Sequence, residues 1–549
     1  MASQTAAYIK STLLAVGQAI GAITPLRMQD IADTFVPWED PANASGLGVF
    51  AIFRGAVYAH LVTGVTRGAG QTLGVRQATA TALNAAILYA GNNNLEFKIA
   101  DGIYEFDNTA GIVVSPNFSS FRWTGSNDVT LRQFHSNVPI ISIGSMTNTS
   151  TDTLYGYIID GFTVQYGITQ TGQTAATGIR IGAGQVGWCS FRNITYNDSS
   201  GFKAYDGFTT TAGSTYAGNL FNCEFSNIKV QGFQNNGIKH GLMGEGNNWY
   251  NLFISNPVAG AMGAITGTAF DISSPFFAGG GSESLNGVHI DFIAAAGQIM
   301  NFGSVESIVI NTLHIEECMG ASQLASCTNL VINGCRYLNM NNLAATGGNA
   351  TTPFWYLYDR VSMVVNGMTI TWGGSGFVDT NYLMIFQDQT ATDDQPSVVV
   401  NGLAINDAAT GRAQANRLLA LDRTVTTWVP PEFISRYTFG SAISRIEGAL
   451  WGSVTTTRTI YGQFKHCYLA VPAALAGTIT ITLSNLARSG SGLPCETGNT
   501  IHILRQAGTA TNSLTVNNVA TIIGTANTTA NVNLYYMYNA VGNWVAYTP

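Results

Sequence analysis

Two carboxylates and two imidazoles occupy matched positions in this sequence. His289 and Asp291 stand two residues apart, His314 and Glu316 repeat the pair, and Arg336 follows. Glycoside hydrolysis uses two carboxyl groups, one as acid and one as base or nucleophile, about 5 to 9.5 Å apart. Two carboxylates this close also raise the pKa of one of them, as a general acid requires. We therefore expect Asp291 and Glu316 to act as acid and base, with His289, His314 and Arg336 binding the sugar, if the fold brings them together.

These residues lie in or directly after a six-residue phrase that occurs nine times between Ile159 and Ile405. The fourth residue of each copy, called the anchor below, is apolar, and successive anchors are 22 to 36 residues apart. A period of this size indicates a stacked-repeat architecture. The anchors are Phe162, Ile194, Ile228, Leu252, Val288, Leu313, Cys335, Met368 and Leu403.

Each phrase alternates apolar and polar residues as a strand does, and a bend interrupts it just before the anchor. The bend is Asn-Gly, Asn-Thr, Ser-Asn or Asp-Gly in most copies. Asn and Gly accept the left-handed backbone of a sharp corner, and stacked Asn amides can hydrogen-bond as a ladder. The last five copies all begin the bend with Asn, at positions 286, 311, 333, 366 and 401. The pattern predicts a parallel β-helix, with one corner in each coil.

In a β-helix the residues one and three past each anchor face outward, and adjacent coils lie about 4.8 Å apart. This spacing predicts Asp291 above Glu316 and His289 above His314, with Arg336 next in line. The alternative interpretation of this patch is a subunit contact with ordinary ion pairs.

The repeat resembles the right-handed β-helices of the pectate-lyase type over about residues 75–425. In that family the substrate lies along the first strand of each coil. The resemblance implies a second candidate site, in which a lyase would use Lys239 as base and Arg180 to neutralise a uronate carboxylate. Asp271 would face outward beside them, with Asp206 and Glu245 on nearby loops. Trp355 either stacks on sugar or belongs to the core.

The composition limits the class of protein. Charged residues make up 10% of the chain and aromatic residues 11%, which indicates a folded protein, because disordered chains are rich in charge and poor in aromatics. The net charge of −7 argues against a nucleic-acid partner. No apolar run is long enough to predict membrane insertion. The seven cysteines include no C-x-x-C pair, and Cys189 and Cys223 are expected as buried free thiols. We expect no metal site and no cofactor, since no metal-ligand spacing or phosphate-binding loop is present.

Both ends of the chain differ from the repeat. A helix is predicted after Thr24-Pro25, and the phrase Ala22–Ile31 resembles segments near the attachment ends of bacteriophage tail fibres and tailspikes. A second helix at 77–90, followed by strands at 95–99 and 103–106, resembles the entrance to tailspike β-helices. Beyond Pro430-Pro431, short strands predict a β-sandwich, at 479–483, 500–504, 513–516 and 532–538. The closing phrase Gly542–Val545 resembles the last strand of phage fibre tips.

The sequence thus predicts an all-β protein: a right-handed parallel β-helix with a small helical N-terminal segment and a C-terminal β-sandwich. The expected parts are an attachment segment (1–65), a linker with a capping helix and first strands (66–110), the shaft (111–425) and a trimerisation or receptor-binding domain (426–549).

The resemblance implies a homotrimeric bacteriophage tailspike, made in the host cytoplasm and carried on the virion. Its N-terminal segment would attach to tail or portal and adaptor proteins. The spike would bind host surface polysaccharide and cleave it by hydrolysis. The alternatives are a non-enzymatic receptor-binding or structural fibre, a polysaccharide lyase, and a free secreted pectinase-like enzyme.

Overall fold

The chain forms two compact units, Met1–Val230 and Gln231–Pro549, which are described separately. The computed structural model describes residues 52–53, 55–144, 152–171, 175–182, 184–198, 203–210, 219–241, 246–258, 261–262, 267–273, 281–293, 297–303, 305–318, 320–325, 329–340, 355–357, 361–372, 384–387, 397–407, 419–422, 432–439, 442–447, 449–451, 458–460, 466–471, 479–483, 498, 500–505, 514–518, 534–541 and 543–546. The helix predicted after Thr24-Pro25 lies outside these residues.

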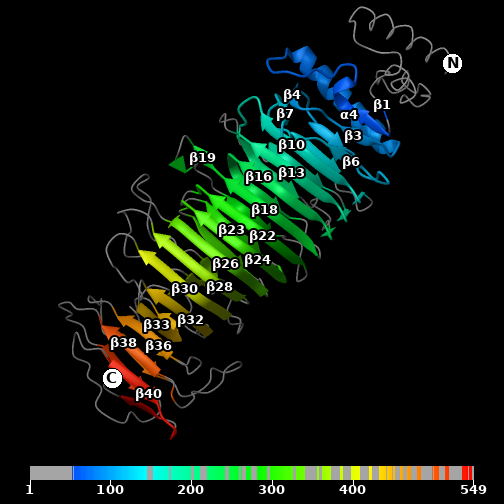
Figure 1. The fold of residues 1–549 in the computed structure, drawn as a ribbon. Helices are drawn as coiled ribbons and strands as arrows, with labels where there is room; N and C mark the ends of the chain where they lie inside the picture. Colours follow the sequence, from blue (N-terminus) through cyan, green and yellow to red (C-terminus); the bar gives the residue numbers. More distant parts are fainter. Residues whose placement is uncertain are drawn as a thin grey trace, which may run out of the picture. The chain divides into compact units, whose positions relative to one another are not determined.

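A helix lies at the predicted place near the start of the described residues, and it packs on the first strands of the first unit. Helix α4 (Leu73–Asn92) packs against the short strands β2 (Ala56–Tyr58), β3 (Glu96–Lys98), β4 (Gly102–Phe106) and β5 (Ile112–Val114) (Figure 1). Its buried residues include Leu83, Ala86 and Ile87, so the helix covers this end of the core with apolar side chains. Among the described residues, we find no helix that meets both the length and the hydropathy needed to cross a bilayer.

Three parallel sheets follow in the first unit, and successive coils give one strand to each. The first sheet contains β7 (Val129–Gln133), β10 (Ile158–Tyr166) and β13 (Ser190–Asn197). The second contains β5, β8 (Ile141–Gly144), β11 (Thr177–Gly182) and β14 (Ala204–Thr210). The third contains β9 (Thr153–Tyr155), β12 (Gln185–Gly187) and β15 (Asn219–Phe221). This is the predicted parallel β-helix.

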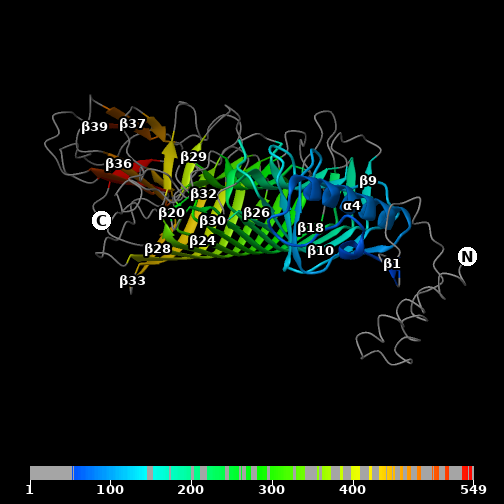
Figure 2. The ribbon, with the colours of Figure 1, turned by 90° about the horizontal axis from the view of Figure 1, so that it is seen from above.

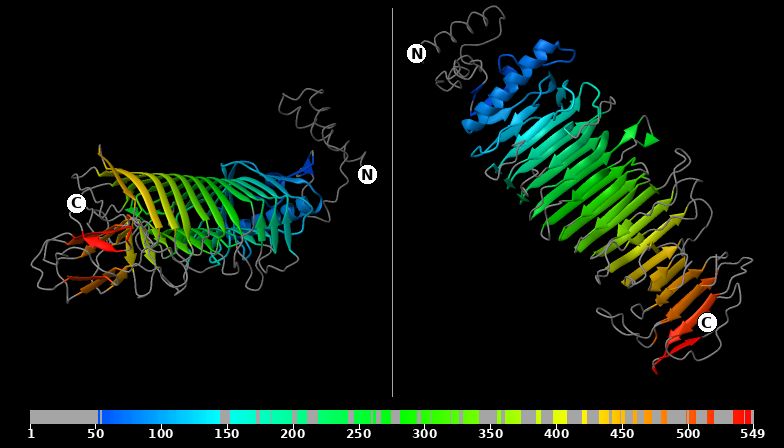
Figure 3. Two further views of the ribbon diagram at one scale, coloured as in Figure 1. Left: turned by 90° about the horizontal axis from the view of Figure 1, so that it is seen from below. Right: turned by 180° about the vertical axis from the view of Figure 1, so that it is seen from behind.

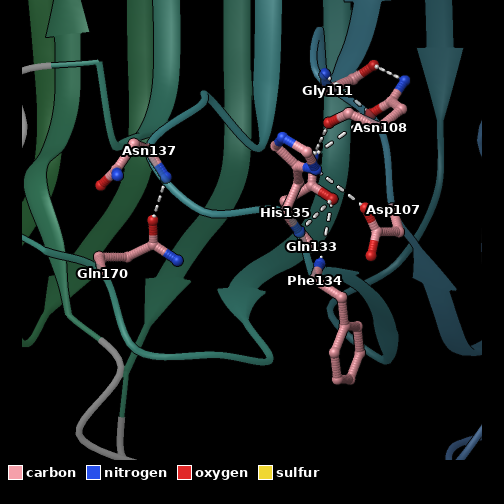
Figure 4. A network of polar contacts seen from close by, with 8 residues as sticks. All are labelled: Asp107, Asn108, Gly111, Gln133, Phe134, His135, Asn137 and Gln170. Carbon is pink, nitrogen blue, oxygen red and sulfur yellow. Dashed lines mark hydrogen bonds and ion pairs between the residues drawn. The ribbon is translucent and has the colours of Figure 1, made fainter. Parts of the chain in front are cut away.

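Side-chain hydrogen bonds hold the loops that leave the first of these sheets (Figure 4). The buried Gln133 Nε2 donates to the Asn108 carbonyl at 3.1 Å, and its Oε1 accepts from the backbone N–H of His135 at 3.1 Å. His135 Nδ1 lies 3.0 Å from Asp107 Oδ1. These contacts tie loops of successive coils to each other, so the network has a structural role.

The second unit continues the same construction with longer strands (Figures 2 and 3). Its first sheet pairs in parallel, with register shifts only after Leu338 in the β26–β28 pair and after Val400 in the β30–β32 pair. It runs through β18 (Asn247–Ser255), β22 (Ser282–Asp291), β24 (Ser307–Glu316), β26 (Asn329–Met340), β28 (Ser362–Trp372), β30 (Ser397–Asp407) and β32 (Glu432–Phe439). Its second sheet runs through β17 (Phe233–His240), β21 (Thr268–Ser273), β23 (Gln298–Gly303), β25 (Ala321–Ala325), β27 (Trp355–Leu357), β29 (Met384–Gln387) and β31 (Leu419–Asp422).

The corner before each anchor has the left-handed backbone that the sequence predicts. The residue that precedes the anchor has a positive φ in all nine copies, namely Gly161, Asn193, Asn227, Asn251, Gly287, Thr312, Gly334, Gly367 and Gly402. The anchors from Phe162 to Met368 are all buried. Each corner therefore turns the chain and points the following side chain into the core.

The Asn residues of the corners form the expected ladder. In the second unit Asn333 Nδ2 donates to Asn311 Oδ1 at 2.9 Å, and Asn366 Nδ2 donates to Asn333 Oδ1 at 2.9 Å. The ladder continues to Asn286 at one end and Asn401 at the other. In the first unit Asn227 donates to Asn193 in the same way. Cys189 and Cys223 are buried thiols that form no disulfide in the described part of the chain, as predicted.

A buried acidic side chain lies inside the core of the second unit, two residues before the repeated phrase that begins at Leu285. Glu283 is 2% exposed and accepts hydrogen bonds from three buried donors. These are His240 Nε2 at 3.1 Å, Asn247 Nδ2 at 2.9 Å and Trp249 Nε1 at 2.9 Å. A buried carboxylate is tolerated only when it is hydrogen-bonded in this way.

The strands from β34 to β41 form two sheets, and successive strands alternate between them as far as β40. One contains β34 (Ala449–Trp451), β36 (His466–Val471), β38 (Thr500–Arg505), β40 (Leu534–Tyr538) and β41 (Trp544–Ala546). The other contains β35 (Arg458–Ile460), β37 (Ile479–Leu483) and β39 (Leu514–Asn518). Only the pairs β38–β40 and β40–β41 are antiparallel. The predicted strands are present, but the parallel pairs differ from the antiparallel sheets of an ordinary sandwich.

Candidate functional site

The predicted outward column is brought together on neighbouring strands of the second unit. His289 on β22 pairs in register with His314 on β24, and His314 pairs with Arg336 on β26. Asp291 pairs with Glu316 in the same ladder. On the other side Phe253 of β18 pairs with His289. The two His-Xaa-acid segments therefore form a two-by-two grid on one face of the sheet.

The imidazoles of this grid stack on each other. The ring centroids of His289 and His314 are 4.5 Å apart, with 6° between the ring planes, and Phe253 meets the His289 ring edge-on at 5.1 Å. Glu316 Oε2 lies 3.6 Å from His314 Nε2 and 3.8 Å from His289 Nε2. These separations are too long for hydrogen bonds. Both Nε2 atoms are buried and have no hydrogen-bond partner.

Burial controls the electrostatics of the grid. Burial raises the pKa of the Asp291 carboxyl, and this outweighs the lowering by the Ser255 hydroxyl and by His289. Burial also lowers the pKa of His314, and His289 and Arg336 lower it further against the opposing effect of Glu316. A raised carboxyl pKa fits a general acid. Asp291 is only 8% exposed, however, so its carboxyl offers little surface to a polymer.

Two residues of the second candidate site are neighbours within the second unit. Lys239 on β17 pairs in register with Asp271 on β21, and Asn301 Nδ2 donates to Asp271 Oδ1 at 2.9 Å. Arg180 lies on β11 of the other unit. The expectation of a loop position for Asp206 is wrong, because Asp206 lies inside β14 and is 6% exposed. Asp206 pairs with Thr177 of β11 in the second sheet. Glu245 lies outside the described residues.

Trp355 is a core residue and cannot stack on a bound sugar. Its side chain is fully buried, and its indole Nε1 donates to the Tyr337 hydroxyl at 2.6 Å. The strand β27 directs its first side chain inward, which is the core alternative that the sequence left open.

An aromatic cluster in the first unit was not predicted. Tyr155 ends β9, Trp188 follows β12 and Phe221 ends β15, so three successive coils each supply one ring. The Trp188 ring lies 5.7 Å from Tyr155 and 5.0 Å from Phe221, between centroids. Trp188 is 62% exposed, the largest exposure of any aromatic side chain in the described parts of the chain. We call these three residues the aromatic platform.

The backbone beneath the platform is specialised. Trp188 has φ +52°, in the left-handed region, where the neighbouring coils have Gly156 and Asn222. A bulky residue in this region is a genuine outlier. Gly187 has no side chain because an added Cβ would lie 2.6 Å from the Phe221 ring and 3.0 Å from the Tyr155 ring. The sequence signal was a Trp at a corner position that Gly and Asn fill elsewhere.

Comparisons with known proteins give little further information. Neither a family model nor a curated protein matches the sequence. One similar solved structure is the full-length tailspike protein 2 of Escherichia coli O157:H7 bacteriophage CAB120, with 12% identity and a TM-score of 0.32. The match covers 85% of this chain and 46% of that protein, so this chain spans about half of its length. Likeness at this level says nothing about what this chain does.

Proposed function

We propose that this chain is the spike protein of a bacteriophage, and that it binds a host surface polysaccharide through the aromatic platform. The observation that carries the proposal is Trp188, which is exposed and strained. Holding a residue of this kind in the left-handed region costs about 1–3 kcal/mol. Exposed apolar clusters on a soluble protein mark binding sites. Contacts with Tyr155 and Phe221 alone do not require a Trp here, since Asn222 occupies the same position in the next coil.

The chemistry of the platform suits a sugar. A pyranose ring has an apolar face of C–H groups and an edge of hydroxyls, so it stacks on an aromatic ring and hydrogen-bonds to its sides. The Tyr155 hydroxyl donates to the Gln185 side chain beside the rings. Asn117 Nδ2 and Asp152 Oδ1, 3.3 Å apart, are exposed near the same strand. Three rings on three coils also match a polymer, which presents the same unit repeatedly.

The proposal extends to assembly. The β-helix would be the shaft of a homotrimer, and residues 1–65 would attach it to tail or portal and adaptor proteins of the virion. The protein would be made in the host cytoplasm and act at the host surface. Residues 426–549 would hold the trimer together or contact the receptor.

Binding can be tested on purified bacterial lipopolysaccharide O-chains and capsular polysaccharides immobilised as an array. The full-length protein is expected to retain at least one of them. Trp188→Asn should abolish that binding while leaving the fold at least as stable, because Asn accepts the left-handed backbone. The matched control is Tyr250→Ala, which removes an exposed aromatic residue outside the platform. Equal binding by the wild type and Trp188→Asn would refute the proposal. Dissociation of the oligomer by Trp188→Asn, seen by light scattering, would instead assign the platform to a contact between copies.

Cleavage of the polysaccharide is the second candidate function. The registered neighbours Asp291 and Glu316 support it, because two carboxyl groups on adjacent strands are the minimum that hydrolysis needs. New reducing ends after incubation with the bound polysaccharide would indicate hydrolysis, and absorbance from an unsaturated uronate would indicate a lyase. Loss of reducing ends in both Asp291→Asn and Glu316→Gln is expected of the pair. Full cleavage by both variants would eliminate it, and no cleavage by the wild type would leave a non-enzymatic receptor-binding spike.

A further inference from the structure

The grid of two imidazoles and two carboxylates has a second possible use. We propose that His289, His314 and Glu316 bind one divalent transition-metal ion, such as Zn²⁺, within a single chain. The three side chains come from the neighbouring strands β22 and β24, whose register sets them opposite each other. This site goes beyond polysaccharide binding, since it shares no residue with the aromatic platform.

The ligating atoms are already close to each other. One ring nitrogen of each histidine and one Glu316 oxygen all lie within 4.8 Å of one another. The Nε2 atoms are buried, and neither of them has a hydrogen-bond partner. A buried polar atom left without a partner is costly, so a cation between the three groups would satisfy both nitrogens at once.

Asp291 adds a further acceptor. It stands two residues after His289, so both side chains lie on the same face of β22. Its Oδ1 is buried and has no hydrogen-bond partner. Two carboxylates thus supply negative charge at the site, and the exposed Arg336 on the next strand is the positively charged neighbour. Asp291 can complete the coordination or orient a bound water.

The type of ligand selects the type of ion. Imidazole nitrogens suit zinc, copper, iron and nickel, whereas calcium and magnesium prefer oxygen ligands. Two histidines and one carboxylate leave open positions for water on such an ion. The coil spacing predicts that His289, His314 and Glu316 lie together, but no short metal-ligand motif marks them as ligands, because they come from two different coils.

Binding requires a small rearrangement. The imidazole planes differ by only 6° and the ring centroids are 4.5 Å apart, so the Nε2 lone pairs lie in two nearly parallel planes, one above the other. Both can reach one ion at the usual 2.0–2.1 Å only if the rings turn about their side-chain bonds. The ion would therefore end the stacking of the two rings, which gives the test a readout in the histidine NMR signals.

The experiment uses the full-length chain without a polyhistidine tag, stripped with a chelator and titrated with Co²⁺ and Zn²⁺. We expect one ion per chain by equilibrium dialysis, a visible Co²⁺ absorption band and shifted histidine signals. Loss of a residue that only orients a metal ligand lowers metal affinity about 10–100-fold. His314→Ala removes a ligand itself and should lower the metal affinity by more than this. Glu316→Gln should also weaken binding. The control His135→Ala removes a half-exposed histidine outside the grid and should leave the affinity unchanged.

Two results would overturn the inference. The first is equal metal affinity of the wild type and the double variant His289→Ala, His314→Ala, with an unchanged circular dichroism spectrum. The second is one ion per three chains that appears only in an oligomer, which would assign the ion to a site between copies. An ion on Glu316 would also remove the base that hydrolysis requires, so Zn²⁺ should inhibit any cleavage and leave polysaccharide binding intact.

Discussion

Thr312 occupies the corner position that Gly or Asn fills in the other eight coils. Its φ is +65°, and it is the β-branched exception among the nine corners. Left-handed backbone costs an L-residue about 1–2 kcal/mol, and a β-branched side chain there is a genuine outlier. The corner of the next coil, Gly334, has nothing within 4 Å of an added Cβ, so a substitution there isolates the backbone cost.

The two positions give opposite expectations. Thr312→Gly removes the strain of about 1–2 kcal/mol but adds about 0.5–1 kcal/mol of entropy to the unfolded chain, so the net gain is about 0.5–1 kcal/mol. Thr312→Asn should gain about 1 kcal/mol, because Asn tolerates this backbone without the entropy of glycine. Gly334→Ala should lose about 1 kcal/mol, because it places a side chain where φ is positive.

Denaturant unfolding of the full-length protein measures these differences, and 1 kcal/mol is about a fivefold change in the folded-to-unfolded ratio. If unfolding is irreversible, the unfolding rate at a fixed temperature replaces the equilibrium value. The reasoning fails if Thr312→Asn is less stable than the wild type, or if Gly334→Ala is as stable as the wild type.

Three further substitutions test the contacts that hold the coils. Glu105 is bound by Arg76 and Arg132, and although burial raises its pKa, backbone N–H groups and Arg76 lower it below the ordinary 4.5. The ionised Glu105 therefore stabilises the fold above pH 4.5, and this stabilisation is lost as the pH falls through the lowered pKa. Glu105→Gln should lower the free energy of unfolding by about 2–3 kcal/mol at pH 7 and change it little in acid. Thermal unfolding of both proteins at the two pH values measures this difference. Asn333→Ala removes two exposed hydrogen bonds of the Asn ladder and should lower the free energy of unfolding by about 1–2 kcal/mol, measured by denaturant titration. An unchanged free energy of unfolding would mean that the ladder does not stabilise the fold. Glu283→Gln replaces one of the two oxygens that accept from the buried donors by an NH₂ group and should cost about 2–4 kcal/mol in a denaturant titration; stability equal to that of the wild type would contradict this expectation.

The architecture could be predicted from the sequence because one local rule is repeated. A sharp corner needs a residue that accepts a positive φ, and the next side chain must enter the core, so a Gly or Asn before an apolar residue marks every coil except the one with Thr312. Residues Gly287 and Val288 show both halves of this rule, with φ +73° and 2% exposure. Once the corners are aligned, the register follows, and with it the pairing of His289 with His314.

The parts that could not be predicted depend on long-range contacts. The buried Glu283 could not be placed in the core from the sequence, because its hydrogen-bond partners His240 and Trp249 come from other strands. The aromatic platform combines residues from three coils at a position outside the repeated phrase. The loop position expected for Asp206 is wrong because Asp206 lies in a strand that pairs with Thr177 of the neighbouring strand β11.

The fixed corners have a consequence for how the chain can change in length. Coils of 22 to 36 residues stack in the same ladder, so the stretch between one corner and the next can grow or shrink while the flanking strands keep their partners. One residue added between a corner such as Gly334 and its anchor would instead exchange the inner and outer faces of everything that follows in that strand. New binding loops can therefore be grafted between coils of this protein, but not within its phrases.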